Sequence, residues 1–120
     1  MQKLGCRVLI VEDQLLIALD LRRMLESLGC VVLGPAPSVE KALALLEEQT
    51  PDIALLDEDL KGIPAVPVAQ ALTRRRIPYV IISGYEHSPS DEDVLVKAAR
   101  VRKPASVSAL SDALDELWPS

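Results

Sequence analysis

The sequence predicts one α/β domain in which helices cover both faces of a five-stranded parallel sheet. Short apolar runs alternate with longer amphipathic segments five times along the 120 residues. Hydrophobic residues make up 49% of the chain, which has no Phe and one Trp, so the core is built from aliphatic side chains. Such a core is typical of a sheet that helices bury on both sides, and right-handed crossovers leave few other arrangements for alternating strands and helices. We therefore treat residues 1–120 as a single domain.

The first strand–helix unit covers residues 7–28. Residues 7–11 form the apolar run Arg-Val-Leu-Ile-Val, which lacks polar alternation and so predicts a strand buried on both faces. Apolar residues then recur at helical spacing over about residues 14–28. Gly29 is placed to end this helix in a left-handed conformation.

The same pattern continues through the second unit and into the third strand. Residues 31–33 predict the second strand. Ser38 is a suitable N-cap for a helix that extends to about Gln49. The apolar residues 53–56 then predict the third strand.

The third helix and the fourth strand follow a loop rich in turn-forming residues. This loop contains Gly62, Pro64 and Pro67, and it leads into a helix over about residues 68–75. The apolar residues 79–82 predict the fourth strand.

The C-terminal third has the weakest patterns. Residues 91–98 allow at most about two helical turns, so the fourth helix is expected to be short or degenerate. Residues 99–102 predict a weak fifth strand, and Ser106 is placed to cap the last helix. The apolar positions of that helix are Val107, Leu110, Leu114 and Leu117.

Composition excludes several classes of function. The net charge is −5 and no basic face is evident, so direct binding of nucleic acid is not expected. No apolar run approaches the roughly 20 residues that cross a bilayer, and the N-terminus lacks a secretory pattern. We therefore expect a cytoplasmic protein. The oligomeric state stays open between a monomer and a weak dimer. Cys6 and Cys30 are interpreted as reduced, partly buried thiols.

Polar residues follow the apolar runs at the ends of four predicted strands. Because ligands of open α/β sheets bind beyond the carboxyl ends of the strands, these residues are the candidate site. The residues, in strand order, are Glu12-Asp13, Asp57-Glu58-Asp59, Ser83-Gly84 and Lys103-Pro104.

These residue types suit phosphoryl transfer to a carboxylate. Carboxylates that lie close together repel one another, and a hard divalent cation with oxygen ligands relieves this repulsion. Asp57 could then attack phosphorus while Mg²⁺ screens its charge. The Lys103 ammonium and the Ser83 hydroxyl could contact phosphoryl oxygens, and the small Gly84 leaves room beside them.

This set of residues, in this order, resembles the receiver domain of two-component response regulators over essentially the whole chain. The resemblance implies a flavodoxin-like fold with strand order 2-1-3-4-5. It implies that Asp57 is the phosphoacceptor and that Ser83 and Lys103 contact the phosphoryl group. It also implies that Mg²⁺ (or Mn²⁺) is bound by Asp13, Asp57, the nearby Glu12 and the backbone carbonyl of Asp59.

The resemblance also implies the partners. A histidine kinase or a histidine phosphotransferase would supply the phosphoryl group. An unknown target protein would receive the signal in trans through a surface that lies roughly between residues 91 and 117, since the sequence shows no output domain.

Residues 78–85 (Pro-Tyr-Val-Ile-Ile-Ser-Gly-Tyr) loosely resemble a receiver subgroup whose fourth strand reads Pro-Phe-x-Phe-Ala-Thr-Gly-aromatic. The chain departs from typical receivers at the switch. Val101 is interpreted as the replacement of an aromatic switch residue before the lysine, and Tyr85 as its substitute or as a ring that simply packs there. Glu58 and Asp59 are expected to influence the lifetime of the phosphoryl group, although Asp59 is equally well interpreted as a solvated acid.

Two other functions stay open. Leu55-Leu56-Asp57-Glu58-Asp59 also resembles the Asp-x-Asp motif of phosphohydrolases of the haloacid dehalogenase type. That motif usually opens the domain, whereas two strand–helix units precede it here. The second alternative is a receiver-like module that binds partners without phosphate, which the missing aromatic residue favours. We expect no enzyme activity beyond the domain's own phosphorylation and dephosphorylation.

Overall fold

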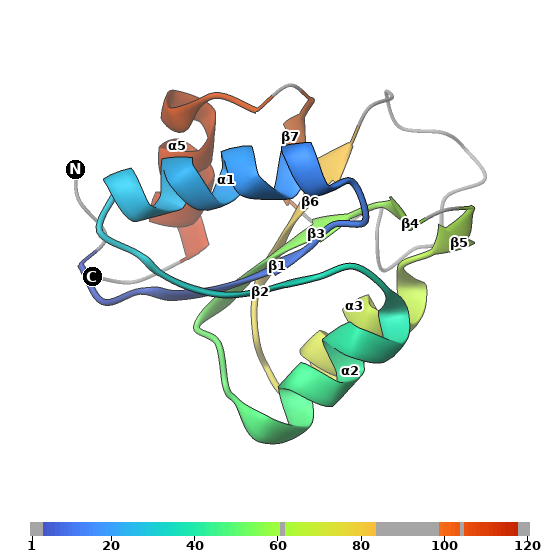
Figure 1. Ribbon diagram of the computed structural model, residues 1–120. Coiled ribbons are helices and arrows are strands. Elements are labelled where there is room, and N and C mark those ends of the chain that lie inside the picture. The colour runs from blue at the N-terminus through green and yellow to red at the C-terminus, as the bar shows by residue number, and fades with distance from the viewer. Residues whose placement is uncertain (1–3, 61, 84–98, 104, 118–120) are drawn as a thin grey trace.

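The computed structural model describes residues 4–60, 62–83, 99–103 and 105–117. Its main sheet has five parallel strands in the order β2-β1-β3-β6-β7 (Figure 1). When only these strands are counted, this is the predicted order 2-1-3-4-5. The strands are β1 (Arg7–Val11), β2 (Val31–Ala36), β3 (Ile53–Asp57), β6 (Tyr79–Ser83) and β7 (Ala99–Arg102).

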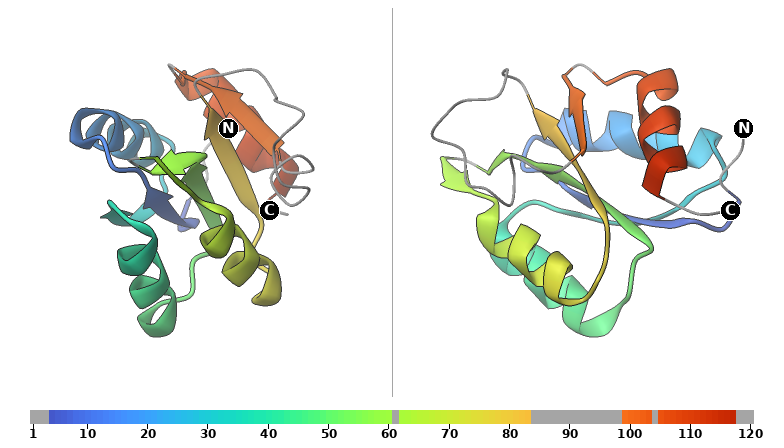
Figure 2. Two further views of the ribbon diagram at one scale, coloured as in Figure 1. Left: turned by 90° about the vertical axis from the view of Figure 1, so that its right-hand side faces the viewer. Right: turned by 180° about the vertical axis from the view of Figure 1, so that it is seen from behind.

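Helices cover both faces of this sheet, as predicted. The described helices are α1 (Leu15–Ser27), α2 (Val39–Glu48), α3 (Val66–Arg74) and α5 (Val107–Leu117). Helices α1 and α5 lie on one face, and α2 and α3 lie on the other (Figures 1 and 2). No helix in the described parts of the chain has the length and apolar character needed to cross a membrane.

Local signals in the sequence fix several helix ends. Gly29 follows α1 with a φ of 89°, the left-handed conformation that was predicted. The Ser38 side chain accepts a hydrogen bond from the Lys41 backbone N–H at 3.2 Å, which caps α2. The Ser106 side chain does the same for Ala109 at 3.1 Å in α5.

Three expectations need correction. Helix α3 begins at Val66 rather than near residue 68, because a proline such as Pro67 is tolerated in the first helical turn. The preceding loop contains a short antiparallel hairpin, β4 (Asp59–Leu60) and β5 (Ile63–Pro64), which had not been predicted. Val107 is 42% exposed, so it does not share the buried stripe of α5 with Leu110.

Two other expectations have different outcomes. Strand β2 extends three residues beyond the predicted 31–33, to Ala36. The expected fourth helix at residues 91–98 lies outside the described residues.

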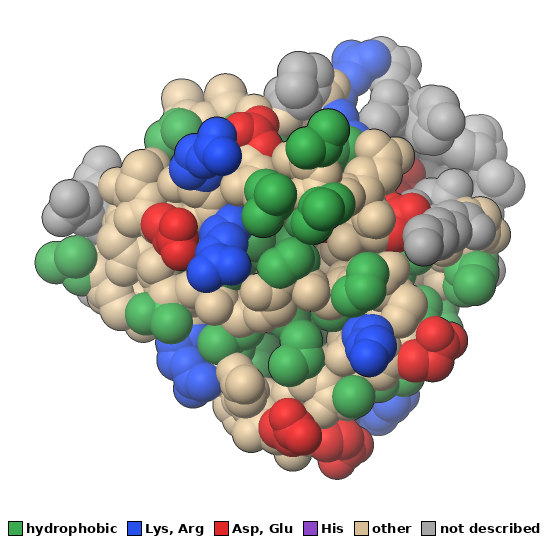
Figure 3. Space-filling model, in the orientation of Figure 1, with side chains coloured by type: hydrophobic (Ala, Val, Ile, Leu, Met, Phe, Trp, Pro, Cys, Tyr) green, Lys and Arg blue, Asp and Glu red, His purple; other side chains and the backbone are tan. Residues whose placement is uncertain are grey.

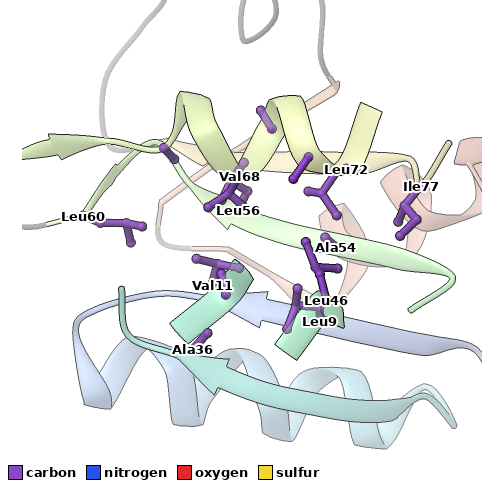
Figure 4. Close-up of a cluster of buried hydrophobic side chains, with 14 of the residues drawn as sticks. Leu9, Val11, Ala36, Leu46, Ala54, Leu56, Leu60, Val68, Leu72 and Ile77 are labelled. Atoms are coloured by element: carbon purple, nitrogen blue, oxygen red, sulfur yellow. The ribbon is translucent and has the colours of Figure 1, made fainter. Parts of the chain in front are cut away.

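Two aliphatic cores lie on the two faces of the sheet, and Figure 4 shows the one beneath α2 and α3. Leu9, Ala54 and Leu56 from the sheet contribute to it, as does Leu46 from α2. Leu72 of α3 is completely buried there. Since the strands are parallel and nearly all residues of β1, β3 and β6 are buried, the centre of the sheet is a rigid support for the loops at its carboxyl edge.

Leu72→Ala should lower the free energy of unfolding by about 2–5 kcal/mol, because it removes buried methyl groups and leaves a cavity. Urea denaturation followed by circular dichroism measures this difference. Leu16→Ala on α1 is the matched control: Leu16 is 81% exposed, so the change should be within about 0.5 kcal/mol. Equal losses in both variants would contradict the described packing of α3.

Candidate functional site

The predicted polar residues meet at the carboxyl edge of the main sheet. Glu12 and Asp13 directly follow β1, and Asp57 is the last residue of β3. Ser83 ends β6, and its carbonyl accepts a hydrogen bond from the Lys103 backbone N–H at 2.8 Å. The parallel register therefore brings residues from four separate strands to one place, as the sequence predicted.

Buried polar side chains gather at this edge of the sheet. Glu12, Asp57 and Ser83 are the polar residues that are buried among those the structure describes. Burying charged groups is costly unless they are paired or bind a metal. The site is thus a place where the fold accepts an energetic cost, which is typical of functional residues.

Three carboxylates form an acidic cluster. One oxygen from each of Glu12, Asp13 and Asp57 lies within 4.8 Å of the other two. Lys103 Nζ is 3.2 Å from Glu12 Oε1 and 3.3 Å from Asp57 Oδ1. One ammonium offsets only one of three negative charges, so the cluster keeps an excess of negative charge that favours a cation.

The acidic cluster changes the pKa of Lys103. Burial lowers the pKa of the Lys103 ammonium, but the negative charges of Asp57 and Glu12 outweigh this effect and raise the pKa above its ordinary value. Lys103 therefore keeps its positive charge at neutral pH, within reach of the Asp57 carboxylate.

The oxygen atoms of the cluster fit a hard divalent cation. Asp13 Oδ1 is buried and accepts no hydrogen bond from any described residue. Glu12 Oε2, by contrast, accepts a hydrogen bond from the Gln14 backbone N–H at 3.2 Å, which holds the Glu12 side chain in place. A buried oxygen without a donor is costly, and coordination of Mg²⁺ or a similar cation would satisfy it.

A second group of contacts, centred on Glu58, lies beside the cluster. Ser83 Oγ donates a hydrogen bond to Glu58 Oε1 at 3.1 Å. The guanidinium of Arg100, in β7, contacts Glu58 Oε2 at 2.9 Å. Arg100 was not among the residues predicted for the site, although the alternation Ala-Arg-Val-Arg of β7 places Arg100 on the face opposite to Val101.

The remaining candidate residues have different positions. Val101 is buried in the core beneath α1 and α5. Asp59 begins β4, two residues after Asp57 at the end of β3, and the Asp59 side chain lies outside what the structure describes. Gly84 and Tyr85 also lie outside the described residues.

An apolar surface adjoins the site. A cavity of about 240 Å³ lies between α1, β6 and the segment that precedes α5, and its lining includes Ile17, Met24 and Lys103. Hydrophobic side chains gather over α1 on the face shown in Figure 3. Leu15, Leu16 and Leu19 are the exposed leucines of this helix.

Comparison with known proteins places this arrangement in one family. A model of the family described as "Response regulator receiver domain" matches residues 8–115. The transcriptional regulatory protein PdtaR of Mycobacterium tuberculosis (strain CDC 1551 / Oshkosh) is 31% identical over 116 residues, which cover 91% of this chain and 55% of PdtaR. The chain thus spans about half the length of this curated relative.

Solved structures agree with the fold. SdrG from Sphingomonas melonis Fr1 is 36% identical, with a TM-score of 0.82 and a match over 98% of each chain. The response regulator PhyR from Brucella abortus is 29% identical, with a TM-score of 0.82 over 97% of this chain and 49% of PhyR.

Proposed function

The chain belongs to the response regulator receiver family, and from this premise we propose that it accepts a phosphoryl group on Asp57 from a histidine kinase or a histidine phosphotransferase. The observation that carries the proposal is the pairing of a buried carboxylate with a cationic side chain inside an acidic cluster. Asp57 and Lys103 are in contact at 3.3 Å, and Glu12 and Asp13 lie beside them.

The chemistry follows from these positions. An Asp57 carboxylate oxygen attacks phosphorus of a phosphohistidine, a P–O bond forms, and the P–N bond breaks with its electron pair passing to the imidazole nitrogen. The product is an acyl phosphate on Asp57. Lys103, already held next to Asp57, neutralises charge on the phosphoryl oxygens as the group arrives. The Ser83 hydroxyl supplies a hydrogen bond to the transferred group.

The acidic cluster is proposed to hold Mg²⁺ (or Mn²⁺). Glu12, Asp13 and Asp57 would contribute carboxylate oxygens, and Asp59 would contribute its backbone carbonyl. When bound, the cation offsets the negative charge that would otherwise keep the phosphoryl group away from Asp57. The buried, unsatisfied Asp13 Oδ1 supports this assignment.

The protein is proposed to have two kinds of protein partner in the cytoplasm, a phosphodonor and a target that receives the signal. The exposed leucines on α1 (Leu15, Leu16 and Leu19) lie on the helix that follows the acidic cluster, where a protein that presents a phosphohistidine could dock. We propose neither nucleic-acid binding nor membrane insertion, and we expect a monomer or weak dimer. The domain would turn over no external substrate beyond its own phosphodonor.

Incubation with acetyl phosphate and Mg²⁺ should add the mass of one phosphoryl group to the intact protein, and EDTA should prevent this gain. Asp13→Asn should need a much higher Mg²⁺ concentration, because it removes one carboxylate from the cluster. Intact-mass spectrometry over a Mg²⁺ titration measures both effects.

Asp112→Asn in α5 is the matched control, since Asp112 is exposed and lies outside the acidic cluster; its Mg²⁺ requirement should equal that of the unmodified protein. No mass gain, under conditions that phosphorylate a known receiver, would contradict the proposal and favour a module that binds without phosphate. Continuous release of p-nitrophenol from p-nitrophenyl phosphate would instead support the phosphohydrolase alternative.

A further inference from the structure

The Glu58 side chain connects Ser83, at the carboxyl end of β6, to Arg100 in β7. One carboxylate oxygen accepts the Ser83 hydroxyl at 3.1 Å, and the other contacts the Arg100 guanidinium at 2.9 Å. The Glu58 and Arg100 side chains are only 17% and 21% exposed. Solvent therefore screens this ion pair weakly, and the contacts are stronger than those of an ordinary surface pair.

The backbone fixes the three residues relative to one another. The Glu58 N–H donates to the Ile82 carbonyl at 3.3 Å, next to Ser83. Arg100 lies opposite Ile81 in the pairing of β6 with β7. The Glu58 backbone is thus fixed against β6 by a main-chain hydrogen bond, and the Glu58 side chain reaches Arg100 in β7.

This arrangement conflicts with the role of Ser83 in the proposed function. A serine hydroxyl has a single proton to donate. In the structure that proton is directed to Glu58, whereas the phosphorylated protein requires it at a phosphoryl oxygen. The hydroxyl cannot donate to both acceptors at once, so Glu58 and the phosphoryl group compete for it.

We propose that Glu58 is a positioning residue that withholds the Ser83 hydroxyl until a phosphoryl group occupies Asp57, and that Arg100 holds Glu58 in this position. The inference rests on the proposed function and adds a regulatory step to it. On phosphorylation, Ser83 exchanges the Glu58 carboxylate for a phosphoryl oxygen. Glu58 then keeps Arg100 as its partner, so occupancy of Asp57 is transmitted to β7 through polar contacts.

The location of Arg100 determines which face of β7 the exchange of hydrogen bonds affects. Val101, the residue that was interpreted as the altered switch position, is buried in the core beneath α1 and α5. Arg100 lies on the other face of β7 and contacts Glu58. The phosphorylation signal therefore leaves the site on the Arg100 face of β7.

A double-mutant cycle with beryllofluoride, a non-covalent mimic of the phosphoryl group, tests the competition. The variants are Glu58→Ala, Ser83→Ala and the double variant, and ¹⁹F NMR in the presence of Mg²⁺ measures the affinity of each. Removing the Glu58 charge attracts an anion in both serine backgrounds, so this general effect cancels in the cycle. The competition for the Ser83 hydroxyl exists only where Ser83 is present, so its contribution to the affinity remains in the cycle.

We expect Glu58→Ala to tighten beryllofluoride binding roughly tenfold more in the protein that retains Ser83 than in the Ser83→Ala background. Only the protein with Ser83 must break a hydrogen bond to the charged Glu58 carboxylate before the hydroxyl can donate to beryllofluoride. Glu58→Gln, which keeps the shape of the side chain, should give a smaller effect in the same direction. Glu47→Ala is the matched control, because it breaks a Glu–Arg pair with Arg75 at 3.3 Å that lies away from the site. It should leave the affinity unchanged.

Equal tightening in both serine backgrounds, or weaker binding in Glu58→Ala, would overturn the positioning role while leaving Asp57 as phosphoacceptor. Failure of the unmodified protein to bind beryllofluoride or to take up a phosphoryl group would instead overturn the proposed function itself. The two failures are therefore distinguishable in one set of measurements.

Discussion

Asp57→Asn should remain folded and lose phosphoryl uptake from acetyl phosphate, with a rate at least about a thousandfold below that of the unmodified protein. The amide keeps the shape of the side chain at the end of β3 but lacks the nucleophilic carboxylate oxygen. The substitution also removes one of three neighbouring carboxylates, so electrostatic repulsion in the cluster falls. Intact-mass spectrometry gives the rate, and circular dichroism verifies the fold.

The neighbouring acids make this prediction specific. Glu58 is engaged by Ser83 and Arg100, so its carboxylate is not directed at the acidic cluster. If Asp57→Asn still gained one phosphoryl group at a comparable rate, another side chain would be the acceptor. The assignment of Asp57 would then be wrong.

Lys103→Met should lower both the rate of phosphorylation and the stability of the metal-free protein. In the proposed mechanism Lys103 neutralises charge on the transferred group, and removing such a stabilising group typically costs about 10²–10³ in rate. The Lys103 side chain is only 21% exposed, and it contacts two almost completely buried carboxylates, those of Glu12 and Asp57. Leaving buried charges without their partner costs about 3–5 kcal/mol.

Mg²⁺ should recover part of this lost stability. A divalent cation in the acidic cluster can replace the missing positive charge, so saturating Mg²⁺ should stabilise Lys103→Met more than it stabilises the unmodified protein. Urea denaturation in EDTA and in Mg²⁺ measures the four free energies of unfolding. Equal stabilisation of both proteins by Mg²⁺ would contradict a cation site next to Lys103.

Lys41→Met is the matched control for this substitution. Lys41 lies on the exposed side of α2, outside the acidic cluster. Its removal should leave both the phosphorylation rate and the response to Mg²⁺ unchanged.

Much of the fold and the acidic cluster could be predicted because both depend on regular features of the chain. Apolar runs marked the first four strands of the main sheet, and the weaker pattern at residues 99–102 placed β7 as observed. Since parallel strands share one carboxyl edge, the residue after each run was enough to bring Glu12, Asp57 and Lys103 together. Their contacts at 3.2 and 3.3 Å confirm that proximity.

The features that were missed depend on side-chain pairing and on tertiary contacts. Neither the residue type nor the spacing of Glu58 shows that it accepts a hydrogen bond from Ser83, because that contact joins β6 to a residue 25 positions away. The partner Arg100 is 42 positions from Glu58. The β4–β5 hairpin was missed because its two-residue strands are too short to show any periodicity.

The most direct test of the central claim is to locate the phosphoryl group within the chain. Borohydride reduces an aspartyl phosphate to homoserine, which peptide mass spectrometry identifies at a single residue. After treatment with acetyl phosphate and Mg²⁺, homoserine at position 57 alone is the predicted result. Homoserine at another aspartate, or phosphate retained on a side chain that borohydride does not reduce, would contradict Asp57 as the phosphoacceptor.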